Sequence, residues 1–228
     1  GHREATPILL EGLKRLEYRG YDSAGVAVLR DDRDEPEALD LVKSVGRVRV
    51  LEDAITEHGG LPGSIGIAHT RWATHGGVTE ANAHPHCDDA SLGHGIAIIH
   101  NGIIENYQSL RTWLTEKGHV FESETDTEVL VHLIGELYDG DLERAVQSAL
   151  REVEGAYAIA AICRKEPGVM VVARKGSPLL VGVGSDEYVV ASDQSAIVAH
   201  TREVVYLNDY EIVAIQADGF EISTVSGT

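Results

Sequence analysis

Three short polar segments contain the residue types from which a binding site for a small zwitterion could be built. The first, residues 69–76, places Arg71, Trp72, Thr74 and His75 in one irregular stretch. A guanidinium binds a carboxylate through two parallel hydrogen bonds, so Arg71 is a candidate for the carboxylate end of a ligand. The alternative is a surface salt bridge with Trp72 packed beside it, and the residues alone leave both interpretations open.

The second segment, residues 100–106, follows an apolar run and contains Asn101 and Gly102. A side-chain amide beside a glycine N–H offers two neutral donors to one developing negative oxygen, which is what an oxyanion hole requires. The competing interpretation is an ordinary Asn-Gly turn after a strand that ends before residue 100, and the local pattern by itself favours that turn.

The third segment, residues 123–128, contains Asp126. A carboxylate in the first turn of a helix is stabilised by the helix dipole, so Asp126 could serve the helix alone. A free amino acid, however, needs an anion for its ammonium group as well as a cation for its carboxylate. Asp126 and Arg71 would supply that pair.

The histidines and cysteines suggest two other kinds of site, which their spacing does not support. Residues 84–89 contain several donor side chains but match no zinc pattern, so we expect neither a metal nor another cofactor. Cys87 has no identifiable base that would make it a nucleophile. Cys163 ends an apolar run and is expected in the core, and the two cysteines are too far apart in the sequence to suggest a disulfide framework.

The composition excludes several classes of partner. The chain has 228 residues, with 19 Lys and Arg against 37 Asp and Glu, and a formal net charge of −18. Such a surface repels phosphate backbones and anionic lipid headgroups, so we expect no nucleic acid and no membrane as partner. The longest apolar runs are much shorter than the ~20 residues that span a bilayer. With no secretory pattern at the start, a cytoplasmic location is expected.

The elements that must position these segments are helices in the first two-thirds of the chain and strands throughout. The sequence predicts a helix begun by Thr6 and ended before Gly20, one capped by Asn106, and one begun by the capping box of Thr125 and Glu128. Further helices are expected at residues 48–55 and 142–153. Strands are expected at residues 25–29, 41–45, 64–68, 95–99, 157–163, 169–173, 179–182, 188–191, 204–207 and 211–215. Short connections favour antiparallel pairing, which indicates an α+β protein with helices stacked on antiparallel sheets.

Five segments in this order resemble the glutaminase domain of the glutamine:fructose-6-phosphate amidotransferase family, the glucosamine-6-phosphate synthases. They are residues 16–25, 69–76, 82–86, 100–106 and 123–129. The resemblance covers essentially the whole chain, and amidophosphoribosyltransferases differ around His75 and after Gly102. It implies the N-terminal-nucleophile (Ntn) hydrolase fold, a four-layer αββα sandwich with two antiparallel sheets. The domain would comprise residues 1–220, and residues 221–228 would begin a linker to a sugar-isomerase part.

The resemblance also implies roles for the motif residues. Arg71 and Asp126 would hold the α-carboxylate and α-amino groups of L-glutamine. Asn101 and Gly102 would form the oxyanion hole. The other residues would surround the substrate, with Trp72, Thr74 and His75 lining the glutamine pocket and Arg19 lying near the nucleophile.

In that family an N-terminal cysteine attacks the glutamine amide, and sugar-isomerase domains of the same chain use the ammonia to convert fructose 6-phosphate. The cysteine and its Gly-rich strand would precede Gly1, and neither Cys87 nor Cys163 takes the nucleophile's place. We therefore expect these 228 residues alone to bind glutamine weakly, to hydrolyse it at a rate near zero, and to have an unpaired sheet edge.

The resemblance implies a homodimer for the full-length protein. Two alternatives stay open. One is the glutaminase domain of another class II amidotransferase, such as the purine-pathway enzyme, and the other is a non-catalytic amino-acid-binding module.

Overall fold

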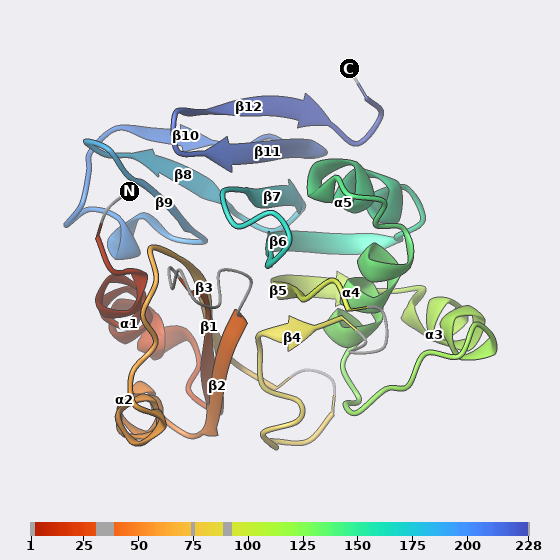
Figure 1. Cartoon of the computed structure of the whole chain (residues 1–228), viewed down its shortest axis with the longest axis horizontal. Coiled ribbons are helices and arrows are strands. Elements are labelled where there is room, and N and C mark those ends of the chain that lie inside the picture. Colours follow the sequence, from red (N-terminus) through yellow and green to blue (C-terminus); the bar gives the residue numbers. More distant parts are fainter. Residues whose placement is uncertain (1–2, 31–38, 74–75, 89–92, 228) are drawn as a thin grey trace.

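A computed structural model describes residues 3–30, 39–73, 76–88 and 93–227 (Figure 1). Its helices are α1 (Ala5–Leu16), α2 (Val48–His58), α3 (Tyr107–Glu116), α4 (Asp126–Glu136) and α5 (Leu142–Arg151), with 3₁₀ turns η1 (Glu17–Arg19) and η2 (Gln194–Ala196). Its strands are β1 (Ser23–Leu29), β2 (Leu39–Val45), β3 (Ile65–Arg71), β4 (His86–Cys87), β5 (Ile96–Ile104), β6 (Gly155–Cys163), β7 (Met170–Lys175), β8 (Leu180–Val183), β9 (Tyr188–Ala191), β10 (Val204–Tyr206), β11 (Glu211–Gln216) and β12 (Gly219–Thr224). Of the helices in these ranges, none is long and apolar enough to cross a membrane.

Within the described ranges the strands form three sheets, and every pair of neighbouring strands is antiparallel. The largest has the order β12-β11-β7-β6-β5-β4, and the two smaller sheets have the orders β2-β1-β3 and β10-β8-β9. The predicted α+β class and antiparallel pairing are therefore confirmed. The expectation of two sheets is wrong in one respect, because the layer opposite the six-stranded sheet is divided into two pieces.

Three apolar clusters separate four layers, as expected for an αββα sandwich. One cluster lies between α1 with α2 and the sheet of β1, β2 and β3, and a second lies between the smaller sheets and the six-stranded sheet. The third packs α4 and α5 against the other face of the six-stranded sheet. Figure 1 shows α1 and α2 on one side of the strands and α3, α4 and α5 on the other.

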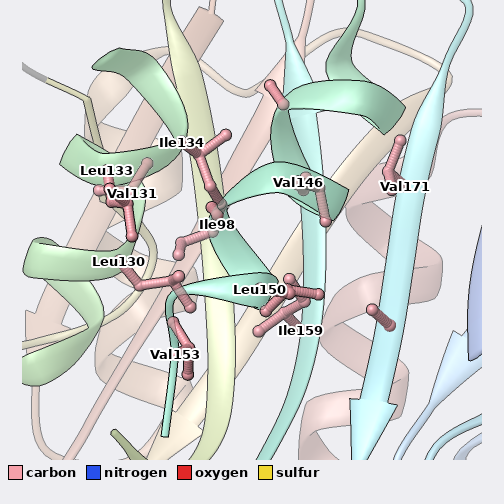
Figure 2. Packing of buried hydrophobic residues seen from close by; sticks show 14 of the residues in the cluster. Ile98, Leu130, Val131, Leu133, Ile134, Val146, Leu150, Val153, Ile159 and Val171 are labelled. Atoms are coloured by element: carbon pink, nitrogen blue, oxygen red, sulfur yellow. The ribbon is translucent and has the colours of Figure 1, made fainter. Parts of the chain in front are cut away.

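Successive side chains of one strand enter different clusters, because they lie on opposite faces of the sheet. In β6, Ile159 and Ala161 enter the cluster beneath α4 and α5, whereas Ala160 and Ile162 enter the cluster between the sheets. Successive side chains of a strand point to opposite faces, so a strand buried on both faces is apolar throughout. Figure 2 shows the helix-covered face, with Leu130, Leu133 and Ile134 of α4 and Val146 and Leu150 of α5 packed around Ile98 and Ile159.

The start of α4 is fixed by a network of hydrogen bonds that only partly follows the predicted capping box. Thr125 Oγ1 accepts from the Glu128 N–H at 3.2 Å. The Glu128 carboxylate does not return to Thr125 but accepts from the backbone N–H groups of Glu122 and Ser123, at 2.7 and 2.8 Å. The loop before α4 is therefore tied to the first turn of the helix, and this arrangement positions Asp126.

Two predicted helix caps are wrong although the helices exist. Thr6 lies inside α1, which begins at Ala5, and its hydroxyl donates to the Leu61 carbonyl at 2.7 Å. Asn106 precedes α3, but its side chain bonds the backbone of Glu152 and Glu154 instead of capping the helix. In both cases a partner distant in sequence competes with the local cap, which a local pattern does not reveal.

The C-terminal strand β12 has no counterpart among the predicted elements. It pairs with β11 from Glu211 opposite Thr224 to Gln216 opposite Gly219. Residues 221–224, assigned to the start of a linker from their polarity, thus lie in the six-stranded sheet. As the outermost strand of that sheet, β12 has polar positions on one face and does not show a long apolar run.

Candidate active site

A cavity of about 670 Å³ opens between the two smaller sheets and the six-stranded sheet. Its walls include β3 and β9, which are the outermost strands of the two smaller sheets, together with α1, part of β5 and the start of α4. The predicted site residues within the described part of the chain line this cavity: Arg19, Arg71, Trp72, Asn101, Gly102 and Asp126. Thr74 and His75, which were also predicted to line it, lie outside the described residues.

Arg71 is the last residue of β3, opposite Ser23 of β1, and only 4% of its surface is exposed. Its Nη1 donates to the Gly77 carbonyl at 3.1 Å. Burial lowers the pKa of the guanidinium, and the nearby carboxylates of Asp22 and Asp126 act in the opposite direction. An arginine remains charged at neutral pH even after such a shift, so the cavity wall contains a fixed cation.

Asp126 is the first residue of α4 and is also buried, with 6% of its surface exposed. Its Oδ2 accepts from the Ile104 N–H at 2.8 Å. The N-terminus of a helix favours a carboxylate, so the helix and this hydrogen bond both suit Asp126 at this position. Asp126 and Arg71 line the same cavity, and the Asp126 carboxylate raises the pKa of the Arg71 guanidinium against the effect of burial.

Asn101 and Gly102 lie within β5, which continues to Ile104. The predicted end of this strand at residue 99 is wrong, and so is the Asn-Gly turn, because Asn101 pairs with Ala158 and Gly102 with Tyr157 in the antiparallel ladder. Gly102 has a φ of 138°, and a Cβ there would lie 2.1 Å from the Ala156 carbonyl oxygen. The glycine is therefore required by a close approach of two strands.

The Asn101 side chain is exposed towards the cavity, and its Oδ1 lies 2.9 Å from His69 Nε2. This contact uses the amide oxygen, so the Nδ2 hydrogens point away from His69. Asn101 can accordingly present a neutral donor to a ligand.

A short loop, residues 76–82, is hydrogen-bonded to the residues before α4. The Glu124 carboxylate accepts from the Gly77 N–H and from Asn82 Nδ2, each at 3.1 Å. Asn82 Oδ1 in turn accepts from the Glu124 N–H at 2.9 Å. These hydrogen bonds lower the pKa of Glu124. Because Arg71 also bonds Gly77, the loop, the guanidinium and the start of α4 form one connected unit.

Trp72 and Arg19 lie at the rim of the cavity. Trp72 is 63% exposed, although it follows the buried Arg71 directly. A Cβ on Gly20 would lie 3.1 Å from the Trp72 Cβ, so the chain after η1 passes close to this residue. Arg19 Nη1 lies 3.6 Å from Asp193 Oδ2. Both side chains are exposed at this rim, where a ligand or another segment of the protein can contact them.

Three histidines of the cavity wall, His69, His84 and His100, are absent from the site predicted from the sequence. Their sequence pattern suggested only metal ligands, and the described residues contain no group of three or more His, Cys, Asp or Glu placed to hold a metal. For His69 in β3 and His100 in β5, the signal is a histidine within a buried, otherwise apolar strand. Such a polar group needs a specific partner, and here the partners, Asn101 and Thr127, line the cavity.

The two cysteines are placed as the sequence indicates. Cys163 is buried among the residues beneath α4 and α5, as predicted. Burial raises the pKa of the Cys87 thiol to about 12. A thiol with such a pKa is protonated near pH 7, so Cys87 is not suited to act as a nucleophile.

Residues 69–199 match the family described as "Glutamine amidotransferase domain". The glutamine--fructose-6-phosphate aminotransferase (isomerizing) of Chlorobaculum tepidum is 51% identical over 231 residues, covering 99% of this chain and 36% of the relative. Its counterpart in Clostridium perfringens is 52% identical over 219 residues, covering 96% and 34%. The chain thus spans about a third of the length of these curated relatives.

Two solved structures resemble this fold over nearly the whole chain. The structure of the allosteric regulatory enzyme of purine biosynthesis has a TM-score of 0.85 at 29% identity and covers 99% of this chain and 47% of that one. Glutamine phosphoribosylpyrophosphate amidotransferase from B. subtilis, complexed with ADP and GMP, has a TM-score of 0.83 at 27% identity and covers 99% and 48%. These neighbours confirm the expected Ntn hydrolase fold. Because the family model matches residues 69–199, more than half of the sequence, this chain belongs to the glutamine amidotransferase domain family.

Proposed function

We propose that this chain binds L-glutamine and, within a longer protein, hydrolyses its side-chain amide to release ammonia. The observation that carries the proposal is that Arg71 and Asp126, two buried and oppositely charged residues, line one cavity beside Asn101. Two buried groups of opposite charge in one cavity suit the two charged ends of a free amino acid.

The placement of glutamine follows from these charges. The Arg71 guanidinium binds the α-carboxylate, and the Asp126 carboxylate accepts from the α-ammonium group. The side-chain carbonyl oxygen then lies towards Asn101 and Gly102, whose Nδ2 and backbone N–H are proposed as the two donors that stabilise negative charge on it. Trp72, Thr74 and His75 are proposed to cover the bound amino acid.

The nucleophile is proposed to be an N-terminal cysteine on a strand that precedes residue 1. Support comes from the cavity itself, because β3 and β9 have no strand partner on the cavity side among the described residues. An extended segment that paired with both would join the two smaller sheets into one layer. Arg3 also lines the cavity, so a preceding segment would enter it directly, with Arg19 close to its end.

The proposed reaction has two steps. The cysteine sulfur attacks the amide carbon, a C–S bond forms, and the C–N bond breaks after the leaving nitrogen receives the thiol proton. The α-amino group of the cysteine, with a pKa of about 8, is the base that carries this proton. Water then cleaves the thioester, which yields glutamate and restores the thiol.

For the full-length protein we propose that the ammonia converts fructose 6-phosphate into glucosamine 6-phosphate. The support is the name of relatives that are about 50% identical, against less than 30% identity to the purine-pathway structures. A sugar-isomerase part after residue 228, a homodimer and a cytoplasmic location belong to the same proposal.

The test is ammonia release from L-glutamine by two proteins. One is the 228-residue chain, and the other carries an upstream Gly-rich strand that begins with cysteine. We expect release only from the second, with Ala in place of the added cysteine as the matched control. A folded second protein that binds glutamine but releases no ammonia would instead support an amino-acid-binding module. Supplying fructose 6-phosphate or phosphoribosylpyrophosphate to the full-length protein decides between the two kinds of amidotransferase.

A further inference from the structure

A column of three histidines lies behind the proposed oxyanion hole. The rings of His69 and His84 are stacked with centroids 4.4 Å apart, and the His86 ring meets His84 edge-on at 4.9 Å. All three are buried. His69 belongs to β3, whereas His84 precedes β4 and His86 is its first residue, so the column joins two parts of the chain beside Asn101.

One end of the column contacts Asn101 and the other contacts the start of α4. His69 Nε2 lies 2.9 Å from Asn101 Oδ1, and His86 Nε2 lies 3.0 Å from Thr125 Oγ1. His100, which is adjacent to Asn101 in the chain, is engaged elsewhere, because its Nδ1 lies 3.1 Å from Thr127 Oγ1. His69 is therefore the histidine of the column that contacts the Asn101 amide.

The tautomer of His69 follows from its partners. Asn101 Oδ1 is only an acceptor, so the hydrogen bond requires a proton on Nε2. His69 Nδ1 is buried and has no hydrogen-bond partner in the described part of the chain. A proton on Nδ1 would be an unsatisfied buried donor, whereas a proton on Nε2 is satisfied. Burial lowers the pKa of His69 to about 4, so the ring is neutral near pH 7.

We propose that His69 is a positioning residue that holds the Asn101 carboxamide with its oxygen towards the protein and its Nδ2 hydrogens towards the glutamine carbonyl. The stacked His84 ring fixes the plane of the His69 ring. The inference rests on the proposed function, because it assigns a purpose to the Asn101 donor. Without His69 the amide can rotate and present its oxygen, which would repel a developing oxyanion.

The kinetic test uses the full-length protein with its upstream cysteine and three variants. His69→Phe keeps a ring that can stack on His84 but has no donor, and His69→Gln replaces the ring with an amide N–H. His58→Phe makes the same kind of change at an exposed histidine of α2, outside the cavity lining, and is the matched control. We expect His69→Phe to lower kcat for ammonia release by about 10- to 100-fold and to leave the KM for glutamine within about threefold, because Arg71 and Asp126 still bind the substrate.

The pattern among the variants distinguishes positioning from a structural role. On a logarithmic scale, His69→Gln should recover at least about a third of the kcat that His69→Phe loses, and His58→Phe should keep a kcat within about threefold of the parent. A kcat for folded His69→Phe within twofold of the parent would overturn the inference. So would a loss in which KM rises as much as kcat falls.

A second measurement is independent of catalysis. Long-range ¹H–¹⁵N correlation spectra of the 228-residue chain report which ring nitrogen of His69 carries the proton. We expect the Nε2–H tautomer at pH 7, and the Nδ1–H tautomer or an imidazolium would overturn the inference. If the parent protein releases no ammonia but the Nε2–H tautomer is found, the glutaminase proposal fails while the orientation of Asn101 stands.

Discussion

The two faces of the six-stranded sheet differ in what covers them. The face under α4 and α5 is sealed, and side chains such as Ile98, Ile134 and Ile159 are almost fully buried there (Figure 2). The other face meets two separate three-stranded sheets that enclose an open cavity with buried charges in its wall. The sealed face supplies stability through apolar burial, whereas the wall of the open face contains buried charged groups held by specific hydrogen bonds, from Arg71 to the Gly77 carbonyl and from the Ile104 N–H to Asp126.

The largest loss of glutamine affinity should follow from removing the charge of Arg71 in the open face. Arg71→Gln removes the charge but keeps a donor near the Gly77 carbonyl. We expect the affinity for L-glutamine to fall at least about 100-fold, because the substrate carboxylate loses a buried, charge-assisted partner. Calorimetric titration measures the loss. Unchanged affinity in the folded variant would remove Arg71 from the site.

Shortening an isoleucine to alanine should lower the free energy of unfolding by different amounts on the two faces. Ile134→Ala in α4 should lower the free energy of unfolding by about 2–5 kcal/mol, because a sealed core cannot fill the void. Ile65→Ala in β3 should cost only about 1 kcal/mol, because Ile65 is half-buried and lines the cavity. Denaturant unfolding of both variants checks this difference. Equal losses would contradict the contrast between the two faces.

The histidine column should make the open face sensitive to acid. The pKa of His69 is lowered to about 4 and that of His86 to about 3 by burial, against about 6.5 in the unfolded chain. Between these values the unfolded state binds more protons, so stability is full above pH 6.5 and declines as the pH falls towards the folded pKa values.

The expected loss is about 2 kcal/mol per histidine between pH 7 and pH 5. Denaturant midpoints measured at both pH values test it, with His69→Gln as the control. That variant should show a smaller decline than the parent. An identical decline in the two proteins would mean that other groups cause the acid sensitivity.

The smallest loss of glutamine affinity is expected for a change at Glu124, which bonds the loop of residues 76–82 beside the site. Glu124→Gln keeps an oxygen that can accept from the Gly77 N–H but removes the charge that strengthens the bond from Asn82. Because Glu124 is exposed, the affinity for glutamine should fall by less than about threefold. Titration under the same conditions as for Arg71→Gln provides the comparison. A loss as large as that of Arg71→Gln would show that the loop, not the guanidinium, dominates binding.

How much of the molecule could be predicted also differs between the two faces. Leu130, Leu133 and Ile134 recur with a helical period, so α4 could be placed from the sequence. The continuation of β5 through Gly102 could not, because pairing with β6 overrides a local turn signal. The division of the second layer into two sheets and the polar edge strand β12 likewise depend on distant partners.

The site shows the same limit. Arg71, Asn101 and Asp126 could be proposed from their chemistry, but their convergence depends on the pairing of β3 with β1 and on the packing of α4 against β5. Their charges alone suggested Arg71 and Asp126 as a pair, and the resemblance to a known family added Asn101 to the same site. His69 escaped notice because its role depends on the distance to Asn101, which no local pattern contains.

The most direct test of the central claim asks whether Asp126 binds the α-ammonium group of glutamine. Asp126→Asn removes the charge and keeps an oxygen for the Ile104 N–H. NMR-monitored titration should compare L-glutamine with 4-carbamoylbutanoate, which lacks the α-amino group. We predict that Asp126→Asn weakens glutamine binding at least about tenfold and changes binding of 4-carbamoylbutanoate by less than about twofold, whereas Arg71→Gln weakens both. Equal losses for the two ligands in Asp126→Asn would contradict the account.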